Sequence, residues 1–143
     1  MHVIEVISLL QARVKGWLNK LFFSIRSWFF DVEYEPLTLK ELEAFIDKWV
    51  KEILPKLIYT KERFDCDDFA GLFKYMCIKE TKKNGVGRAI GKVYYKGEFL
   101  GYHAWNIVIL DDGSVINVEP QTGEAFYGSI LHDWKYELLA VIL

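Results

Sequence analysis

The sequence predicts an α+β domain in which N-terminal helices and a central helix pack on one face of an antiparallel β-sheet. Apolar residues recur at helical spacing up to about residue 84. Beyond Gly87 the chain is rich in Val, Ile, Tyr and Phe, and turn sequences separate the apolar runs. Because the helices precede the strands and do not alternate with them, the sheet is expected to be antiparallel.

Three helical segments are expected, and their ends carry recognisable signals. They cover residues 3–30, 38–54 and 66–84. Gly16 is a weak point where the first segment is expected to bend or break. Thr38 and Glu41 form a capping box at the start of the second, and Pro55 ends it.

Four strands follow, covering residues 88–96, 98–110, 114–119 and 135–142. Lys96-Gly97 is a turn between the first two strands. Asp111-Asp112-Gly113 is a strong hairpin signal between the second and third.

Composition limits the partners and the cellular setting. The net charge is −2 and no basic run occurs, which argues against nucleic acid as a partner. The only two cysteines, Cys66 and Cys77, would lie about 16 Å apart on one helix, too far for a disulfide. Reduced thiols and the absence of a signal-peptide pattern predict a cytoplasmic protein.

Residues 1–30 are unusually aromatic and contain four basic residues but only one acid, Glu5. The apolar runs are too short and too charged for a transmembrane span. The favoured interpretation is a helix packed on the core or on a second copy in a homo-oligomer. The alternative is peripheral membrane association through an interfacial helix.

Cys66 stands where a helix is expected to begin, with Asp65 as its N-cap. Free backbone N–H groups and the positive end of the helix dipole favour a thiolate there. Cys77 lies further along the buried stripe of the same helix and is interpreted as an inert core residue.

His103 and Glu119 fall on neighbouring strands and complete a set of chemically complementary groups with Cys66. Cys, His and Glu are the parts of a thiol nucleophile, its base and the group that orients the base. The turn at 111–113 decides whether they meet. A three-residue turn sets Glu119 on the same face as His103, whereas a two-residue turn directs it away.

These residues suggest a family. Cys66, then His103-Ala104-Trp105-Asn106, then Glu119-Pro120-Gln121 resembles the transglutaminase-like branch of papain-like cysteine enzymes. A closer likeness is to the calcium-dependent cysteine protease domain of fungal chimeric lectins (the agglutinin C-terminal domain). The resemblance covers residues 60–125 and implies a papain/transglutaminase-like core.

The resemblance also implies roles. Cys66 would attack an acyl carbon, His103 would move its proton, and Glu119 would hold the imidazole. Gln121, Trp105 and Asn106 are the candidates for oxyanion or substrate contacts.

Asp67 and Asp68 follow the cysteine directly and have two interpretations. They are ordinary acids of a first helical turn, or they bind a divalent cation, Ca²⁺ or Mn²⁺. The acyl-transfer chemistry itself requires no cofactor.

The sequence therefore predicts a thiol-dependent acyl-transfer enzyme, foremost a cysteine peptidase (a hydrolase) acting on a peptide or protein substrate. The single domain 1–143 would comprise an N-terminal hydrophobic helical extension, 1–35, and a catalytic-like core, 60–143. The alternative is a non-catalytic binding or structural module that keeps the fold, with its N-terminal helix mediating oligomerisation or membrane docking.

Overall fold

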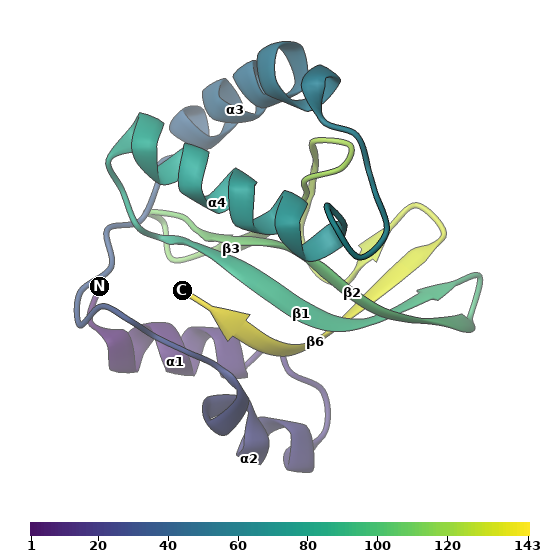
Figure 1. The fold of residues 1–143 in the computed structure, drawn as a ribbon. Helices are drawn as coiled ribbons and strands as arrows, with labels where there is room; N and C mark the ends of the chain where they lie inside the picture. The colour runs from purple at the N-terminus through teal and green to yellow at the C-terminus, as the bar shows by residue number, and fades with distance from the viewer.

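A six-stranded antiparallel sheet organises the chain (Figure 1). The computed structural model describes the backbone of residues 1–143 and every side chain except those of Leu21, Ser24 and Ile25. The strands are β1 (Val86–Tyr95), β2 (Glu98–Ile109), β3 (Val115–Glu119), β4 (Glu124–Phe126), β5 (Ile130–Leu131) and β6 (Trp134–Ile142). Their order across the sheet is β4-β3-β2-β1-β6-β5.

Four α-helices cover the two faces of this sheet. They are α1 (Val3–Gln11), α2 (Trp17–Arg26), α3 (Leu39–Lys48) and α4 (Cys66–Thr81). Figure 1 shows α3 and α4 over one face and α1 and α2 over the other. The prediction that the helices share one face is therefore wrong, because the sheet carries apolar side chains on both faces.

Local sequence explains where the helices begin and end. The expected segment 3–30 is interrupted over residues 12–16. Gly16, whose φ of +81° suits glycine, is the last residue before α2 begins. The capping box of Thr38 and Glu41 is present at the start of α3. After α3 the chain forms a π-helical turn, Trp49–Ile53, and a 3₁₀ turn, Leu54–Lys56.

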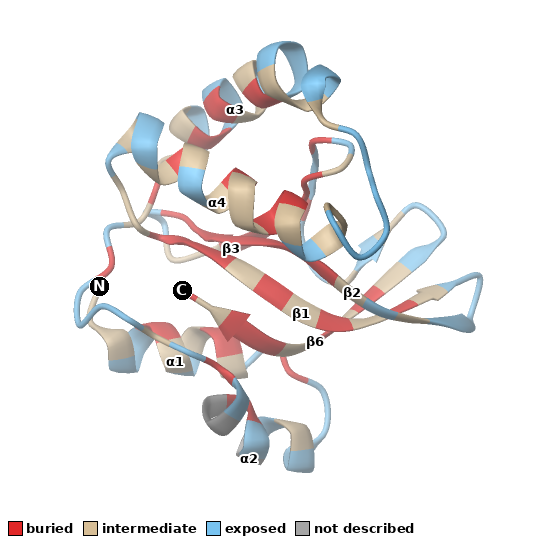
Figure 2. Cartoon of the chain, viewed as in Figure 1, coloured by how far each residue is buried: buried red, intermediate tan, exposed pale blue. Residues whose placement is uncertain are grey.

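Two apolar clusters lie on the two sides of the sheet, and Figure 2 shows the buried residues along the central strands. In the first, Val6, Leu10 and Phe23 from α1 and α2 pack with sheet residues such as Trp105. The second lies under α3 and α4 and includes Trp49 and Phe73, whose rings lie 5.1 Å apart. Burying each of these large side chains stabilises the fold by about 1.5–3 kcal/mol.

The sheet curls until its two ends approach each other. The Tyr136 hydroxyl on β6 donates a hydrogen bond of 3.0 Å to Glu119 at the end of β3. The rings of Tyr136 and Phe126, on β6 and β4, have centroids 4.9 Å apart. At the rim, His132 Nε2 beyond β5 lies 3.1 Å from the Glu124 carboxylate on β4. The architecture is thus a nearly closed, barrel-like sheet.

This architecture corrects the predicted fold class. A papain/transglutaminase-like core would place a large helical part beside its sheet, whereas here the curled sheet dominates and the helices are at most 16 residues long. No helix whose side chains the structure describes meets the length and hydropathy needed to cross a membrane.

Candidate functional site

The turn between β2 and β3 sets the register on which the site depends. Leu110 N donates to Ser114 O at 2.9 Å, and Gly113 N donates to Leu110 O at 3.0 Å. Gly113 has a φ of +81°, as the last residue of a three-residue turn requires. The pairing of Asn106 with Val118 then sets Glu119 opposite Trp105.

Glu119 is consequently buried against His103. The residue is 6% exposed, and one carboxylate oxygen, Oε2, lies 2.7 Å from His103 Nε2. The same oxygen accepts the Tyr136 hydroxyl, while Oε1 accepts the backbone N–H of Gln121 at 3.2 Å. Three donors from three parts of the chain therefore fix this carboxylate.

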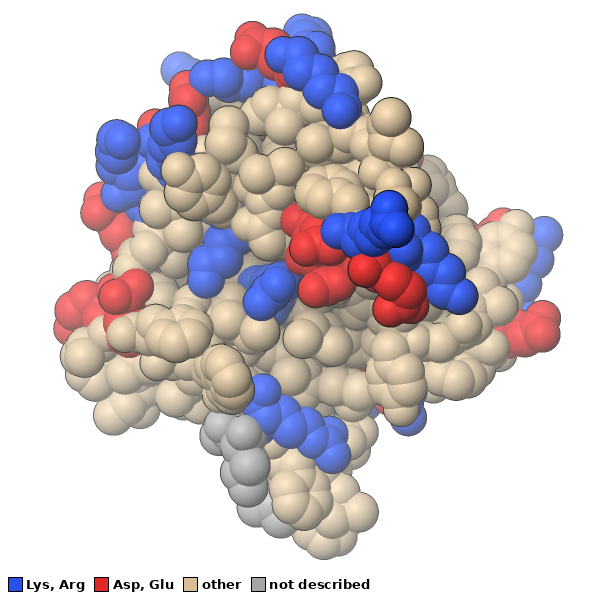
Figure 3. Space-filling model, in the orientation of Figure 1, with Lys and Arg blue, Asp and Glu red and all other residues tan. Residues whose placement is uncertain are grey.

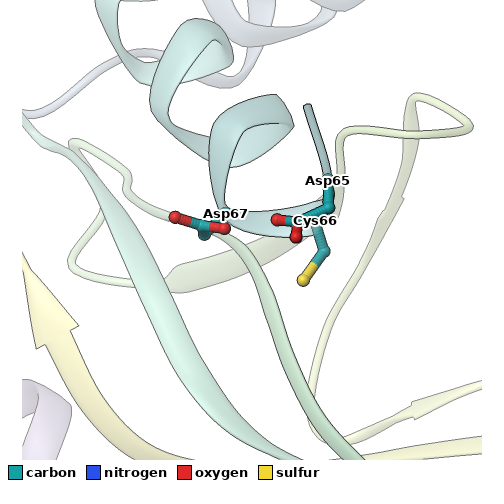
Figure 4. Close-up of side chains that lie close together, drawn as sticks. All are labelled: Asp65, Cys66 and Asp67. Atoms are coloured by element: carbon teal, nitrogen blue, oxygen red, sulfur yellow. The ribbon is translucent and has the colours of Figure 1, made fainter. Parts of the chain in front are cut away.

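Cys66 approaches the same imidazole from the start of α4. Asp65 caps the helix, its side chain accepting from the Asp68 N–H while the Asp68 carboxylate accepts from Asp65 N at 3.2 Å. Figure 4 shows the Cys66 sulfur pointing away from the first turn of the helix. The thiol is half-buried and close enough to His103 to affect its protonation.

The charge on His103 reflects these neighbours. Burial opposes protonation of the ring, but hydrogen bonding to Cys66 and to Glu119 outweighs it and raises the pKa of His103 to about 9. The imidazole is therefore positively charged at neutral pH. Burial, together with Glu119, raises the pKa of Tyr136 above its ordinary value, so its hydroxyl keeps its proton.

The other predicted contact residues take different places. Trp105 is 1% exposed, its ring is nearly parallel to that of His103 at 6.3 Å, and its indole N–H donates to Asn117 at 2.8 Å. Asn106 is fully buried, and its amide donates to the carbonyls of Ala70 and Gly87. Asn106 thus ties α4 to β1 inside the molecule.

Gln121 lies at the rim of a cavity of about 430 Å³ at the mouth of the curled sheet. His103 and Glu119 form part of its lining, and exposed Tyr102 and Trp134 provide aromatic faces. Cys66 lies outside this lining.

The acids next to Cys66 are arranged differently from the prediction. Ligand atoms of Asp65, Cys66 and Asp67 lie within 4.8 Å of one another, whereas Asp68 serves the helix cap. A hydrogen bond with Asp65 and partial burial raise the pKa of Asp67. Ca²⁺ takes six to eight oxygen ligands, and this cluster offers two carboxylates and a thiol. A calcium or manganese cofactor stays a prediction.

Tyr136 and Asn117 are site residues that the sequence did not single out. Alternation along β6 places Tyr136 on the same side as Leu138, within the first apolar cluster. Its contact with Glu119 arises from the curl of the sheet, for which the sequence holds no local signal.

Comparison with known proteins gives structural likeness only. No protein-family model and no curated protein matches the chain. A structure described as "PSL1a-E64 complex" superposes with a TM-score of 0.67 at 23% identity, covering 100% of this chain and 51% of that one. A Polyporus squamosus lectin bound to a human-type influenza-binding epitope, Neu5Acα2-6Galβ1-4GlcNAc, gives a TM-score of 0.65 at 23% identity, covering 100% and 49%.

At this identity the likeness shows the fold, and this chain spans about half the length of the chains it matches. The fold resembles that of about half of the Polyporus squamosus lectin chain.

These comparisons correct the functional predictions. One of the two similar structures is described as a lectin, and neither description names a cysteine peptidase. On this finding, the assignment to papain-like or transglutaminase-like cysteine enzymes is wrong, including its closer form, the cysteine protease domain. The prediction of a hydrolase or acyltransferase acting on a peptide is therefore also wrong. The alternative, a non-catalytic binding module that keeps the fold, agrees better with the comparisons.

Proposed function

We propose that this chain is a carbohydrate-binding module whose ligand occupies the cavity at the mouth of the sheet. The observation that carries the proposal is the lining of that cavity. Tyr102 and Trp134 expose ring surface, and Gln121 and Glu124 supply an amide and a carboxylate beside them. Sugar rings have apolar C–H faces that pack on aromatic rings and hydroxyl rims that hydrogen-bond to such polar groups.

The comparison with a lectin supports the same ligand class. That lectin is described as bound to a sialylated trisaccharide. Because this chain corresponds to about half of the lectin chain, the location of the ligand on this half is argued from the cavity alone.

Calorimetric titration with Neu5Acα2-6Galβ1-4GlcNAc, galactose and N-acetylglucosamine tests the proposal. We expect saturable binding of at least one of these sugars, weakened at least about tenfold by Trp134→Ala, because a stacked ring is lost. Tyr75→Ala is the matched control, since Tyr75 is an exposed aromatic on α4, outside the cavity. Absence of binding to all three sugars would contradict the proposal. Peptide turnover that disappears in Cys66→Ala would contradict it equally.

We also propose that Cys66, His103 and Glu119 act together as a polarised thiol site beside this cavity. Support comes from the 2.7 Å contact between His103 and Glu119 and from the raised pKa of His103, to which Cys66 contributes. The Cys66 sulfur thus lies beside a positively charged imidazole, at the start of α4. Cys77 has the opposite environment, because complete burial raises its pKa to about 12.

Alkylation by iodoacetamide should therefore separate the two cysteines. At pH 7.5 we expect Cys66 to react at least about 100-fold faster than Cys77, with site-specific rates measured by peptide mass spectrometry. His103→Ala should slow Cys66 about tenfold or more, because the neighbouring positive charge is removed. Equal rates at the two cysteines, or no effect of His103→Ala, would refute the polarised site.

A further inference from the structure

The outward side of α2 carries large apolar side chains that no described part of the protein covers. Trp17, Leu18 and Phe22 are 73%, 51% and 41% exposed, while Phe23 on the same helix is fully buried in the first apolar cluster. At 100° per residue, Leu18 lies about 140° around the helix from Phe23. Phe23 therefore fixes α2 to the sheet with its other side directed outward.

Further exposed aromatic side chains follow directly after α2 in the chain. Trp28 and Phe30 are 61% and 70% exposed, and their rings meet edge to face at 6.3 Å. The backbone of Trp28 is held in place by hydrogen bonds to Val141 and Leu143, each 2.9 Å long. We call Trp17, Leu18, Phe22, Trp28 and Phe30 the aromatic patch. Surface apolar side chains scattered singly need no explanation, but a group of this kind indicates an interaction site.

Positive charge accompanies the aromatic patch. Lys15, Lys20 and Arg26 are exposed, and the Arg26 guanidinium lies over the Phe22 ring, 5.5 Å from its centroid. Residues 6–30 contain no Asp or Glu, although the whole chain has a net charge of −2. Figure 3 shows Lys or Arg side chains at the bottom of the molecule, in the region where Figure 1 places α2.

The ion pairs among the described side chains leave these three cations available. Those pairs involve other basic groups, such as Lys48, Lys51 and Lys83. The fourth basic residue of this segment, Arg13, instead donates to the carbonyls of Leu9 and Val115.

We infer that the aromatic patch docks this protein on an anionic membrane surface. Trp and Phe side chains enter the headgroup region, and Lys15, Lys20 and Arg26 contact lipid phosphates. Charge complementarity selects this occupant. A second copy of the chain would bring the same three cations face to face, whereas an anionic bilayer pairs them all. The helix is too short to span the bilayer, so it lies on the surface.

Co-sedimentation of the full chain with vesicles tests this inference. We expect binding to phosphatidylcholine vesicles containing about 30% phosphatidylserine, much weaker binding to phosphatidylcholine alone, and loss of binding at high salt. Trp17→Ser/Trp28→Ser should reduce binding at least about tenfold. Lys15→Gln/Lys20→Gln should reduce it by about fivefold for each charge, only on the anionic vesicles.

The matched control is Tyr75→Ser/Phe99→Ser, which removes two exposed aromatic residues from α4 and from the β1–β2 hairpin. Because all these side chains are exposed, thermal melts of the variants should stay close to that of the wild type. An equal loss of binding in the control would overturn the inference. Absence of vesicle binding, with light scattering showing a lipid-free dimer that Trp17→Ser/Trp28→Ser abolishes, would overturn it in favour of a second copy.

Discussion

Glu119→Ala is expected to lower the free energy of unfolding by about 3–5 kcal/mol at pH 7. The carboxylate is buried and accepts hydrogen bonds from His103, Tyr136 and the backbone of Gln121. Its removal leaves a charged imidazole without its counter-ion and a buried hydroxyl without an acceptor, and each loss is costly. Urea unfolding followed by circular dichroism measures the difference.

The matched control is Glu124→Ala, which breaks the second carboxylate–histidine pair of the chain. Glu124 lies 3.1 Å from His132, but both side chains are largely exposed, at 46% and 69%. Solvent-exposed pairs contribute about 0–1 kcal/mol, so this variant should be nearly as stable as the wild type. Similar losses in Glu119→Ala and Glu124→Ala would mean that burial of the first pair has no energetic role.

Stability should also depend on pH through His103. Its folded-state pKa, about 9, exceeds the ordinary value of 6.5, so protonation favours the folded state. This stabilisation is fully present below about pH 6.5 and is lost as pH rises through 9; it amounts to about 3 kcal/mol at most. In Glu119→Ala, the decrease in the free energy of unfolding between pH 6.5 and pH 9 should be smaller than in the wild type. An unchanged pH profile would show that Glu119 does not raise the pKa of His103.

Gly91→Ala is expected to be the most damaging single-methyl change in the sheet, lowering the free energy of unfolding by about 3 kcal/mol. A Cβ at this position would overlap the Glu137 carbonyl and lie 2.8 Å from the Trp105 ring. The clash falls at a β-bulge, where the β1–β6 register shifts between Ile90 and Gly91. Neither obstacle can move freely, since one is strand backbone and the other a fully buried indole.

Gly71→Ala, in contrast, is expected to raise the free energy of unfolding. Gly71 lies inside α4, and the nearest atom to its added Cβ would be Arg88 Nη1 at 3.5 Å, an ordinary contact. Replacing a helical glycine by alanine should stabilise the protein by about 0.5–1 kcal/mol. Chemical denaturation of both variants checks the pair of expectations. A Gly91→Ala protein as stable as the wild type would exclude close packing of β6 on β1.

Features set by local chemistry could be predicted from the sequence. The α4 start at Cys66 follows from the Asp65 cap, and the break at Gly16 follows from its freedom at positive φ. The β2–β3 register follows from a glycine at the third position of the turn. In each case a few adjacent residues determine the backbone, so the information lies within one short segment.

Features set by distant contacts could not be predicted. The short strands β4 and β5 have too few residues to show an alternating pattern. The covering of both sheet faces and the curl that brings Tyr136 to Glu119 depend on how the twist of six strands accumulates. Cys66, His103 and Glu119 could each be identified from the sequence. The enzymatic role assigned to them depended on a family resemblance that the structural comparisons contradict.

The π-helical turn after α3 links the outer helices to the cavity. The Trp49 indole N–H donates to the Pro120 carbonyl at 2.8 Å, and Val50 packs directly against Gly123. The loop that carries Gln121 to the cavity rim is thus fastened to a helix on the opposite side of the sheet. Displacing the cavity rim would therefore break the Trp49–Pro120 hydrogen bond or carry the turn that follows α3 along with it.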